Sequence, residues 1–307
     1  MNTQIKLAII AISIIIPLSS IAVYGTDSSQ QFEKTENSKM QVISSFYPLH
    51  EFSQIVGEEK IDAILLVPVG VEPHDWEPTI KDVQQIQKSD LIIINGIGFE
   101  SWVDSFNENT YHGKIIDTSN GILAKESKED EHEDEHGHES GDPHIWLNPI
   151  YAKKQVQNIA LAFSNEDPEN EEFYHTNAAK YNEQLSLLDS KIKNELSGCK
   201  SDFVAFHEAF SYFANEYDLN QHTIISSTNS HGEVTAKTLE NVISKSKELG
   251  ITVIFNEDTI DSKTSNVIAD EINGKVLVLS PLEIASDGTY ISKMTENLEN
   301  LKVALCR

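Results

Sequence analysis

Residues 168–198, PENEEFYHTNAAKYNEQLSLLDSKIKNELSG, separate two halves of similar pattern in this 307-residue chain. Apolar side chains recur along the segment three, four or seven residues apart, which is the spacing of one face of an α-helix. These side chains are Tyr174, Tyr181, Leu185, Leu188, Ile192 and Leu196. Asp167 can cap the helix, Pro168 suits its first turn and Gly198 can end it. We therefore predict a stiff linking helix over 167–198, roughly 40 Å long at about 1.5 Å per residue.

On both sides of this helix, short β-rich runs alternate with amphipathic segments. The strand-like runs are 41–48, 61–68, 90–96 and 114–120 before the helix, and 202–207, 222–227, 253–257 and 275–281 after it. The helical patterns are 79–89, 99–109, 208–218, 236–250 and 262–272. Such alternation predicts parallel sheets covered by helices. We expect an α/β fold of two similar (β/α)4-type lobes, over 40–166 and 199–307, joined by the one rigid helix.

The N-terminal segment has the pattern of an export signal or a membrane anchor. Lys6 precedes an uncharged, mostly apolar run from Leu7 to Val23, which is on the boundary between a signal-peptide core and a short membrane span. We assign this role to 1–25 and expect a flexible tether over the polar residues 26–39. The folded part should therefore lie outside the cytoplasm, in the periplasm or on the outer face of the cell membrane.

Charge and cysteine content narrow the function further. The 49 acidic and 23 basic residues give a net charge of −26, which argues against nucleic acid as a partner because phosphates would be repelled. The two cysteines, Cys199 and Cys306, could form a disulfide in an exported chain or remain as two free thiols. A disulfide closing so long a loop would contribute about 4–5 kcal/mol in the chain-entropy model.

A His-rich, acidic loop over 126–142 contains the pattern H-E-x-x-H at residues 132–136. This pattern makes a protease site only on a helix, where both imidazoles share one face. Nine of the seventeen residues of the loop are acidic, and two glycines and the following proline disfavour a helix. We therefore predict a solvated loop that attracts metal ions through His132, His136 and His138.

A second set of metal-binding residue types follows the predicted strands. The set comprises His74, His144, His207 and Glu283. In open parallel sheets, ligands bind beyond the carboxyl ends of the strands, and two members of the set come from each half. Three imidazoles and one carboxylate would give Zn²⁺ a tetrahedral shell between the lobes. Glu257 and Glu72 are competing carboxylates, and any one of these histidines could instead be a hydrogen-bonded structural residue.

The same residues lie in segments that resemble a known family. FYPLHEF, GVEPHDWEPT, DPHIWLNP, VAFHEAFSYFANEYDL and LSPLE are similar to the signature segments of zinc- and manganese-binding solute-binding proteins of ABC transporters, the ZnuA-like group. The resemblance covers roughly 41–305 and implies two α/β lobes, one long helix and a metal in the interlobe cleft. It implies three histidine ligands, His74, His144 and His207, with Glu283 as the carboxylate. The chain departs from the family pattern at Ser280, where other members are acidic, and in GEVTAK, which lacks the usual proline.

These features together indicate a metal-capturing protein rather than an enzyme. We expect a monomer that binds Zn²⁺ in the cleft and delivers it to an ABC-transporter permease, while the acidic loop collects ions. The resemblance favours zinc over manganese because manganese-type members tend to have a carboxylate at position 207. A manganese importer component and a metal-stabilised adhesin remain alternatives, followed by a zinc hydrolase. For the remaining histidines we expect structural or surface roles; they are His50, His112, His175, His222 and His231.

Overall fold

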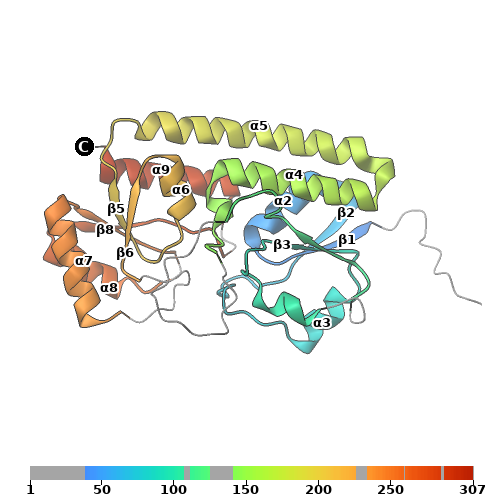
Figure 1. Ribbon diagram of the computed structural model, residues 1–307, viewed down its shortest axis with the longest axis horizontal. Coiled ribbons are helices and arrows are strands. Elements are labelled where there is room, and N and C mark those ends of the chain that lie inside the picture. Colours follow the sequence, from blue (N-terminus) through green and yellow to red (C-terminus); the bar gives the residue numbers. More distant parts are fainter. Residues whose placement is uncertain are drawn as a thin grey trace, which may run out of the picture. The chain divides into compact units, whose positions relative to one another are not determined.

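The computed structural model describes residues 39–106, 111–124, 141–225, 234–258, 260–284 and 287–306. The predicted export segment 1–25, the tether up to residue 38 and the three loop histidines His132, His136 and His138 lie outside these ranges. Within the described residues, no helix has the length and apolar character needed to cross a membrane. Residues 39–307 form one compact unit, and Figure 1 shows its helices and sheets.

The first lobe contains a four-stranded parallel sheet in the order β2-β1-β3-β4. Its strands are β1 (Met40–Ser44), β2 (Ile61–Leu65), β3 (Leu91–Ile94) and β4 (Lys114–Asp117). Successive residues of β3 point to opposite faces, so Leu91 and Ile93 join one hydrophobic cluster and Ile92 and Ile94 join another. Helix α2 (Tyr47–Gly57) covers the first of these faces, and α3 (Ile80–Ile86) covers the second (Figure 1).

The second lobe repeats this arrangement with the strand order β6-β5-β7-β8, again all parallel. Its strands are β5 (Asp202–Ala205), β6 (Asn220–Thr223), β7 (Val253–Asn256) and β8 (Lys275–Val278). Its helices are α6 (Ser211–Glu216), α7 (Ala236–Leu249), α8 (Lys263–Glu271) and α9 (Tyr290–Leu305). In each lobe the first strand of the chain lies second in the sheet. The predicted pair of similar parallel-sheet lobes is therefore confirmed.

The two lobes are joined by α5 (Glu171–Leu196), the long helix of the fold. All six residues of its predicted apolar stripe are at most 5% exposed. Helix α5 packs against α4 (Pro149–Glu166) beside the first lobe and against α9 beside the second (Figure 1). One hydrophobic cluster includes residues from both sheets and from all three of these helices. The lobes therefore share a continuous core, which opposes a wide hinge motion between them.

The start of the long helix differs from the predicted boundary. The segment Pro168–Asn170 forms a separate 3₁₀ turn, and α5 begins at Glu171. The carboxylate of Asp167 accepts hydrogen bonds from the Tyr174 hydroxyl and the Asn170 amide, each at 2.7 Å, instead of from backbone N–H groups of the helix. Asp167 therefore stabilises the turn between α4 and α5 rather than capping α5.

Two further differences concern helices. In the described part of the predicted helix over 99–109, up to residue 106, the structure has a short 3₁₀ segment, Ser101–Ser105, in which Trp102 alone is buried. A single buried side chain provides no apolar stripe, so a longer helix gains little from packing there. Helices α2, α4 and α9 were not among the predicted helical patterns, although each has a buried face.

Of the two alternatives for Cys199 and Cys306, the disulfide is the one present, with an S–S distance of 2.03 Å and a sequence separation of 107. Cys306 follows the last residue of α9, and Cys199 lies just before β5. Next to this bond, the Lys302 ammonium contacts the Glu195 carboxylate at 2.7 Å. The C-terminal end of α9 is thus covalently attached to the segment that leaves α5.

Candidate metal centre

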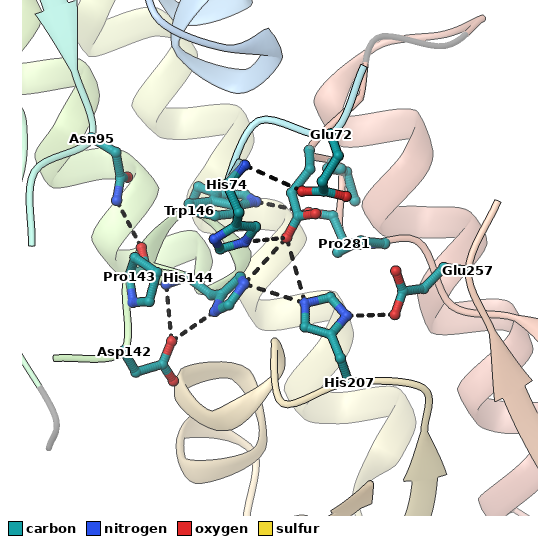
Figure 2. A network of polar contacts seen from close by, with 12 residues as sticks. Glu72, His74, Asn95, Asp142, Pro143, His144, Trp146, His207, Glu257 and Pro281 are labelled. Carbon is teal, nitrogen blue, oxygen red and sulfur yellow. Dashed lines mark hydrogen bonds and ion pairs between the residues drawn. The ribbon is translucent and has the colours of Figure 1, made fainter. Parts of the chain in front are cut away.

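Four side chains that the sequence singled out converge between the two lobes. His74 follows β2 and His144 follows β4 in the first lobe, whereas His207 follows β5 and Glu283 follows β8 in the second. One ligand atom from each residue lies within 4.8 Å of the ligand atoms of the other three. Figure 2 shows the imidazoles of His74, His144 and His207 directed toward one another. The carboxyl ends of both parallel sheets face this point, which explains how residues so distant in sequence meet.

The spacing of these atoms matches a tetrahedral shell. Four ligands about 2.0–2.1 Å from a zinc ion lie about 3.3 Å from one another along the edges of the tetrahedron. Oε1 of Glu283 lies 3.3 Å from Nε2 of His74, 3.2 Å from Nε2 of His144 and 3.6 Å from Nε2 of His207. The Nε2 atoms of His144 and His207 are 3.4 Å apart. Four of the six edges are therefore close to the length that a zinc ion requires.

The cluster is almost completely enclosed. The side chains of His144 and His207 have no exposed surface, that of Glu283 is 2% exposed and that of His74 is 9% exposed. Charged or potentially charged groups at this depth need partners, because burial penalises them strongly. His74 is the member of the cluster most accessible to solvent.

His74 is held by aromatic packing and by its own loop. Its ring contacts the Phe99 ring edge-on at 4.7 Å between centroids, and Trp76 packs against Trp102 at 5.9 Å. The backbone N–H of His74 donates a hydrogen bond to Oε1 of Glu72 at 3.3 Å. Glu72, a competing carboxylate in the sequence analysis, thus supports the loop rather than joining the four-residue cluster (Figure 2).

His144 is oriented by Asp142, two residues earlier. Oδ1 of Asp142 accepts hydrogen bonds from the ring Nδ1 of His144 at 2.8 Å and from its backbone N–H at 3.0 Å. The Ser211 hydroxyl donates to the other oxygen of Asp142, and the Tyr212 hydroxyl donates to its carbonyl at 2.7 Å. With Nδ1 directed at Asp142, Nε2 is the ring nitrogen that faces the centre of the cluster and can bind a metal once it is deprotonated.

Glu257 orients His207 in the same manner. The ring Nδ1 of His207 lies 2.5 Å from Oε1 of Glu257, and Gln221 donates to the His207 carbonyl at 2.7 Å. Glu257 is therefore not part of the four-residue cluster, although its position after a strand made it a candidate ligand in the sequence. Asp142 and Glu257 stand behind their histidines, one in each lobe (Figure 2).

The loop that carries Glu283 is fixed from two sides. The indole Nε1 of Trp146 donates a hydrogen bond to the Pro281 carbonyl at 2.8 Å (Figure 2). Ser280 exchanges backbone hydrogen bonds with the side-chain amide of Asn297 on α9, at 2.7 and 2.8 Å. Ser280, which departs from the family pattern, therefore anchors the loop to α9 and is not part of the cluster.

Within the cluster, the pKa of the Glu283 carboxylate is lowered, and the pKa values of the His144 and His207 imidazoles are raised. Burial opposes the charged form of Glu283, but the attraction of His74 and hydrogen bonds from the other two histidines outweigh it and hold its pKa well below the ordinary value. Burial lowers and Glu257 raises the pKa of His207, with a net increase to about 10. The pKa of His144 is raised by Asp142 and Glu283 against the effect of burial. A divalent cation entering the cluster replaces protons on the imidazoles.

The remaining histidines stand apart from this cluster where the structure describes them. His222 pairs with Asp202 at 2.9 Å, and His175 lies 3.9 Å from Glu171 on the surface of α5. His50 and His112 are also outside the cluster, and His231 lies outside the described residues. The sequence analysis missed the orienting role of Asp142, although a carboxylate two residues before a histidine is a signal that could have indicated it.

A buried cluster of three histidines and one carboxylate, shared by two parallel-sheet lobes on a common core, defines a two-lobed metal-binding protein. The sequence model of the ZnuA family, described as zinc-uptake complex component A, periplasmic, matches residues 42–304. The chain belongs to this family.

Relatives agree with the family assignment. The high-affinity zinc uptake system protein ZnuA of Bacillus subtilis is 36% identical over 299 residues, which are 93% of each chain. The zinc-binding protein AdcA of Streptococcus pyogenes is 32% identical over 314 residues, covering 94% of this chain but 61% of AdcA. The chain thus spans about three fifths of the AdcA length. In structure, it resembles the laminin-binding protein Lmb of Streptococcus agalactiae, described as having adhesin and metal-transporting activity, with a TM-score of 0.80 and 27% identity over 87% of this chain and 99% of Lmb.

Proposed function

We propose that this chain captures Zn²⁺ outside the cytoplasm and delivers it to the membrane permease of an ABC importer. His74, His144, His207 and Glu283 are the ligands in this proposal. The observation that carries it is the convergence of their four ligand atoms within 4.8 Å in an enclosed position between the lobes, with four of the six distances close to those of a zinc shell. The names of the Bacillus and Streptococcus relatives, which refer to zinc uptake and zinc binding, support the same ion.

The donor set favours zinc over manganese. Three imidazole nitrogens and one carboxylate oxygen suit Zn²⁺, whereas Mn²⁺ prefers shells rich in oxygen. The two imidazoles held by Asp142 and Glu257 become more basic donors, which further favours a borderline-soft cation. A histidine at position 207, rather than a carboxylate, keeps the shell nitrogen-rich.

The four protein ligands also favour transport over catalysis. A catalytic zinc site keeps an open position for water or substrate, whereas a shell of four protein ligands is closed. Release then requires that one ligand moves away. Because both lobes share one core, we expect small movements of the ligand-bearing loops rather than wide separation of the lobes.

Further parts of the proposal rest on sequence alone. His132, His136 and His138, which lie outside the described residues, would collect zinc weakly near the cluster because they alternate with carboxylates. The apolar segment within 1–25 would direct export and could retain the protein at the membrane. We propose that the protein acts as a monomer.

The test compares zinc stoichiometry in the full chain with that in the same chain lacking residues 126–140. Elemental analysis after dialysis should give one tightly held zinc in both proteins, with any additional weak binding confined to the full chain. A chelator should remove the ion, and fresh zinc should restore it, because cargo must exchange. If the shortened chain retains no zinc, the loop is the binding site and the proposed cluster is wrong. If the ion cannot be exchanged without unfolding, it is structural and the transport role fails.

Adhesion is a second candidate, favoured by the structural likeness to Lmb. In that case the metal would stabilise the fold, and binding to a host matrix protein would be the function. A surface-immobilised laminin assay, with the zinc-loaded and zinc-free full chain, distinguishes the two roles. Saturable laminin binding supports adhesion, and its absence restricts the chain to metal capture.

A further inference from the structure

The carboxylate of Glu51 connects the two lobes at a place away from the metal cluster. Glu51 lies on α2 in the first lobe, and its two oxygens accept hydrogen bonds from the backbone N–H of Tyr290 at 2.9 and 2.8 Å. Tyr290 is the first residue of α9 in the second lobe. The first N–H groups of a helix have no partner within the helix, and a carboxylate there also interacts favourably with the helix dipole. A side chain of one lobe therefore caps a helix of the other.

Neighbouring groups reinforce this connection. The Tyr47 hydroxyl, one turn before Glu51 on α2, lies 2.6 Å from the Glu51 carboxylate and 3.1 Å from the Gly288 carbonyl. The Tyr181 hydroxyl on α5 approaches the same carboxylate at 3.4 Å. The cap residue of α9, Thr289, pairs with the N–H of the residue three positions later, so its side chain does not replace Glu51.

A chain of hydrogen bonds leads from Glu51 to both halves of the metal cluster. The Tyr290 hydroxyl donates to the carbonyl of Trp146 at 2.6 Å. The indole N–H of Trp146 donates in turn to the carbonyl of Pro281 at 2.8 Å. Trp146 is two residues beyond His144, and Pro281 is two residues before Glu283. The position of Tyr290 thus affects one ligand loop from each lobe.

The two ends of α9 are held differently. Its C-terminal end is fixed covalently by the disulfide of Cys306. Its N-terminal end is held to the first lobe by the Glu51 carboxylate and by the Tyr47 contact. Tyr290 is fully buried, so a displacement of this end moves a packed side chain rather than a solvated one.

We propose that Glu51 is a positioning residue that sets the separation of His144 and Glu283 through Tyr290 and Trp146. It touches neither the ion nor a ligand. This inference rests on the proposed function, because it assigns Glu51 a role in retaining zinc at the same cluster. With the Glu51 carboxylate seated on the N-terminus of α9, the four ligand atoms keep the short distances to one another that the cluster shows. Without it, the two ligand loops separate more easily and the ion leaves faster.

The test is the zinc dissociation rate of the full-length variant Glu51→Gln, measured with an excess of a chromophoric chelator. The amide keeps the volume but turns an NH₂ group toward the Tyr290 N–H or the Tyr47 hydroxyl. Groups that directly hold a ligand typically change metal affinity by 10–100-fold, and Glu51 acts further away, so we expect dissociation about 3–10-fold faster. Association should change little, because His74, the most exposed of the four ligands, is untouched.

A second variant separates positioning from simple stability. Tyr290→Phe removes the hydroxyl that contacts Trp146 but retains the backbone N–H that Glu51 caps. If Glu51 acts through this hydroxyl, the double variant should release zinc no faster than the faster single variant. Multiplied effects of the two changes would overturn the proposed path.

Thr235→Ala is the matched control, because it removes a comparable cap from α7, where the Thr235 hydroxyl accepts the Thr238 N–H at 3.1 Å. It should lower the unfolding free energy similarly while leaving zinc dissociation unchanged. The inference is overturned if the zinc dissociation rate of Glu51→Gln is unchanged, or if that of the control increases equally. In both cases the wild-type chain still binds zinc, so the proposed function stands. Failure of the wild-type chain to hold one zinc would instead overturn the proposed function.

Discussion

Two variants, Glu257→Gln and Glu283→Gln, each replace one carboxylate by an amide. Comparing them shows which carboxylate binds the metal and which only orients a ligand. Glu257 accepts the Nδ1 proton of His207 at 2.5 Å and is 5% exposed. In Glu257→Gln, the amide oxygen can still accept this proton, so the ring keeps its orientation but loses a charged partner. In Glu283→Gln, the one negative member of the proposed ligand set is lost.

The magnitude for Glu257 follows from the nature of its contact. A hydrogen bond involving a charged group contributes about 1.5–3 kcal/mol, and a neutral one contributes about 0.5–1.5 kcal/mol. The difference of about 1–1.5 kcal/mol corresponds to roughly 5–12-fold in the zinc dissociation constant. For Glu283→Gln we expect a loss beyond the roughly 100-fold upper end seen for groups that only orient ligands.

Competition with chelators of known affinity gives both dissociation constants, and cobalt substitution gives the coordination geometry. Glu257→Gln should retain the intense visible absorption of four-coordinate cobalt, whereas Glu283→Gln should lose or shift it. A greater loss of affinity in Glu257→Gln than in Glu283→Gln would refute the reasoning. It would mean that Glu257, not Glu283, supplies the carboxylate ligand.

Two further predictions concern stability. Replacing both Cys199 and Cys306 by alanine should lower the unfolding free energy by about 4–5 kcal/mol, because the cysteines are 107 positions apart in sequence, and should leave zinc affinity nearly unchanged. Urea unfolding measures the stability, and chelator competition measures the zinc affinity. A loss of zinc affinity by the same free energy would contradict the prediction that the disulfide stabilises the fold without affecting the metal cluster. Burial raises the pKa of Glu100 to about 7 from its usual value of 4.5, despite hydrogen bonds from Ser45 and from the N–H groups of Asn95 and Gly96. Between pH 4.5 and about 7, Glu100 is therefore protonated in the folded chain but ionised in the unfolded chain. The contribution of Glu100 to the unfolding free energy falls as the pH rises through this range. Since Glu100→Gln cannot titrate, its stability relative to the wild type should increase by on the order of 3 kcal/mol between pH 4 and pH 8, and a constant difference would contradict the prediction.

The sheets could be predicted from sequence because their signal is local. LIII at 91–94 is apolar throughout and is followed by Asn95-Gly96, so it indicates a strand buried on both faces. Helix α4 is harder to recognise, because its buried face includes small or polar residues such as Ala152, Gln155 and Ser164. The Gln155 amide donates to Asn95 and Thr118 at 3.0 Å, and these partners are distant in sequence. The same face also carries an apolar stripe at helical spacing, made of Ala152, Val156, Ile159 and Phe163, so the signal for this helix was present in the sequence but diluted by its small and polar neighbours.

The cluster was predictable as a set of residues but not as a geometry. His74, His144, His207 and Glu283 all follow strands, and parallel sheets bring such positions to one edge. The strand pattern alone could not distinguish Glu283 from Glu257, because both follow strands of the same sheet, and only the family resemblance favoured Glu283. Which carboxylate joins the cluster depends on the ring nitrogen of His207 that it contacts. The Glu257 carboxylate contacts Nδ1, on the side away from the cluster, and the Glu283 carboxylate contacts Nε2, inside the cluster.

The shared core and the preformed cluster together restrict how the ion can be released. Four of the six distances between the ligand atoms already match a tetrahedral zinc shell, so zinc binding needs little reorganisation of the lobes. The same preorganisation makes release slow unless a ligand is withdrawn.

The four ligands are held in place differently. His144 and His207 are each held by a carboxylate through Nδ1, and the Glu283 loop is anchored to α9 through Ser280. His74 is held by a backbone hydrogen bond to its own loop and by ring contacts, and it is the most exposed of the four. Because His74 is the most accessible ligand, we expect a permease that engages the loop after β2 to open the shell there without separating the lobes.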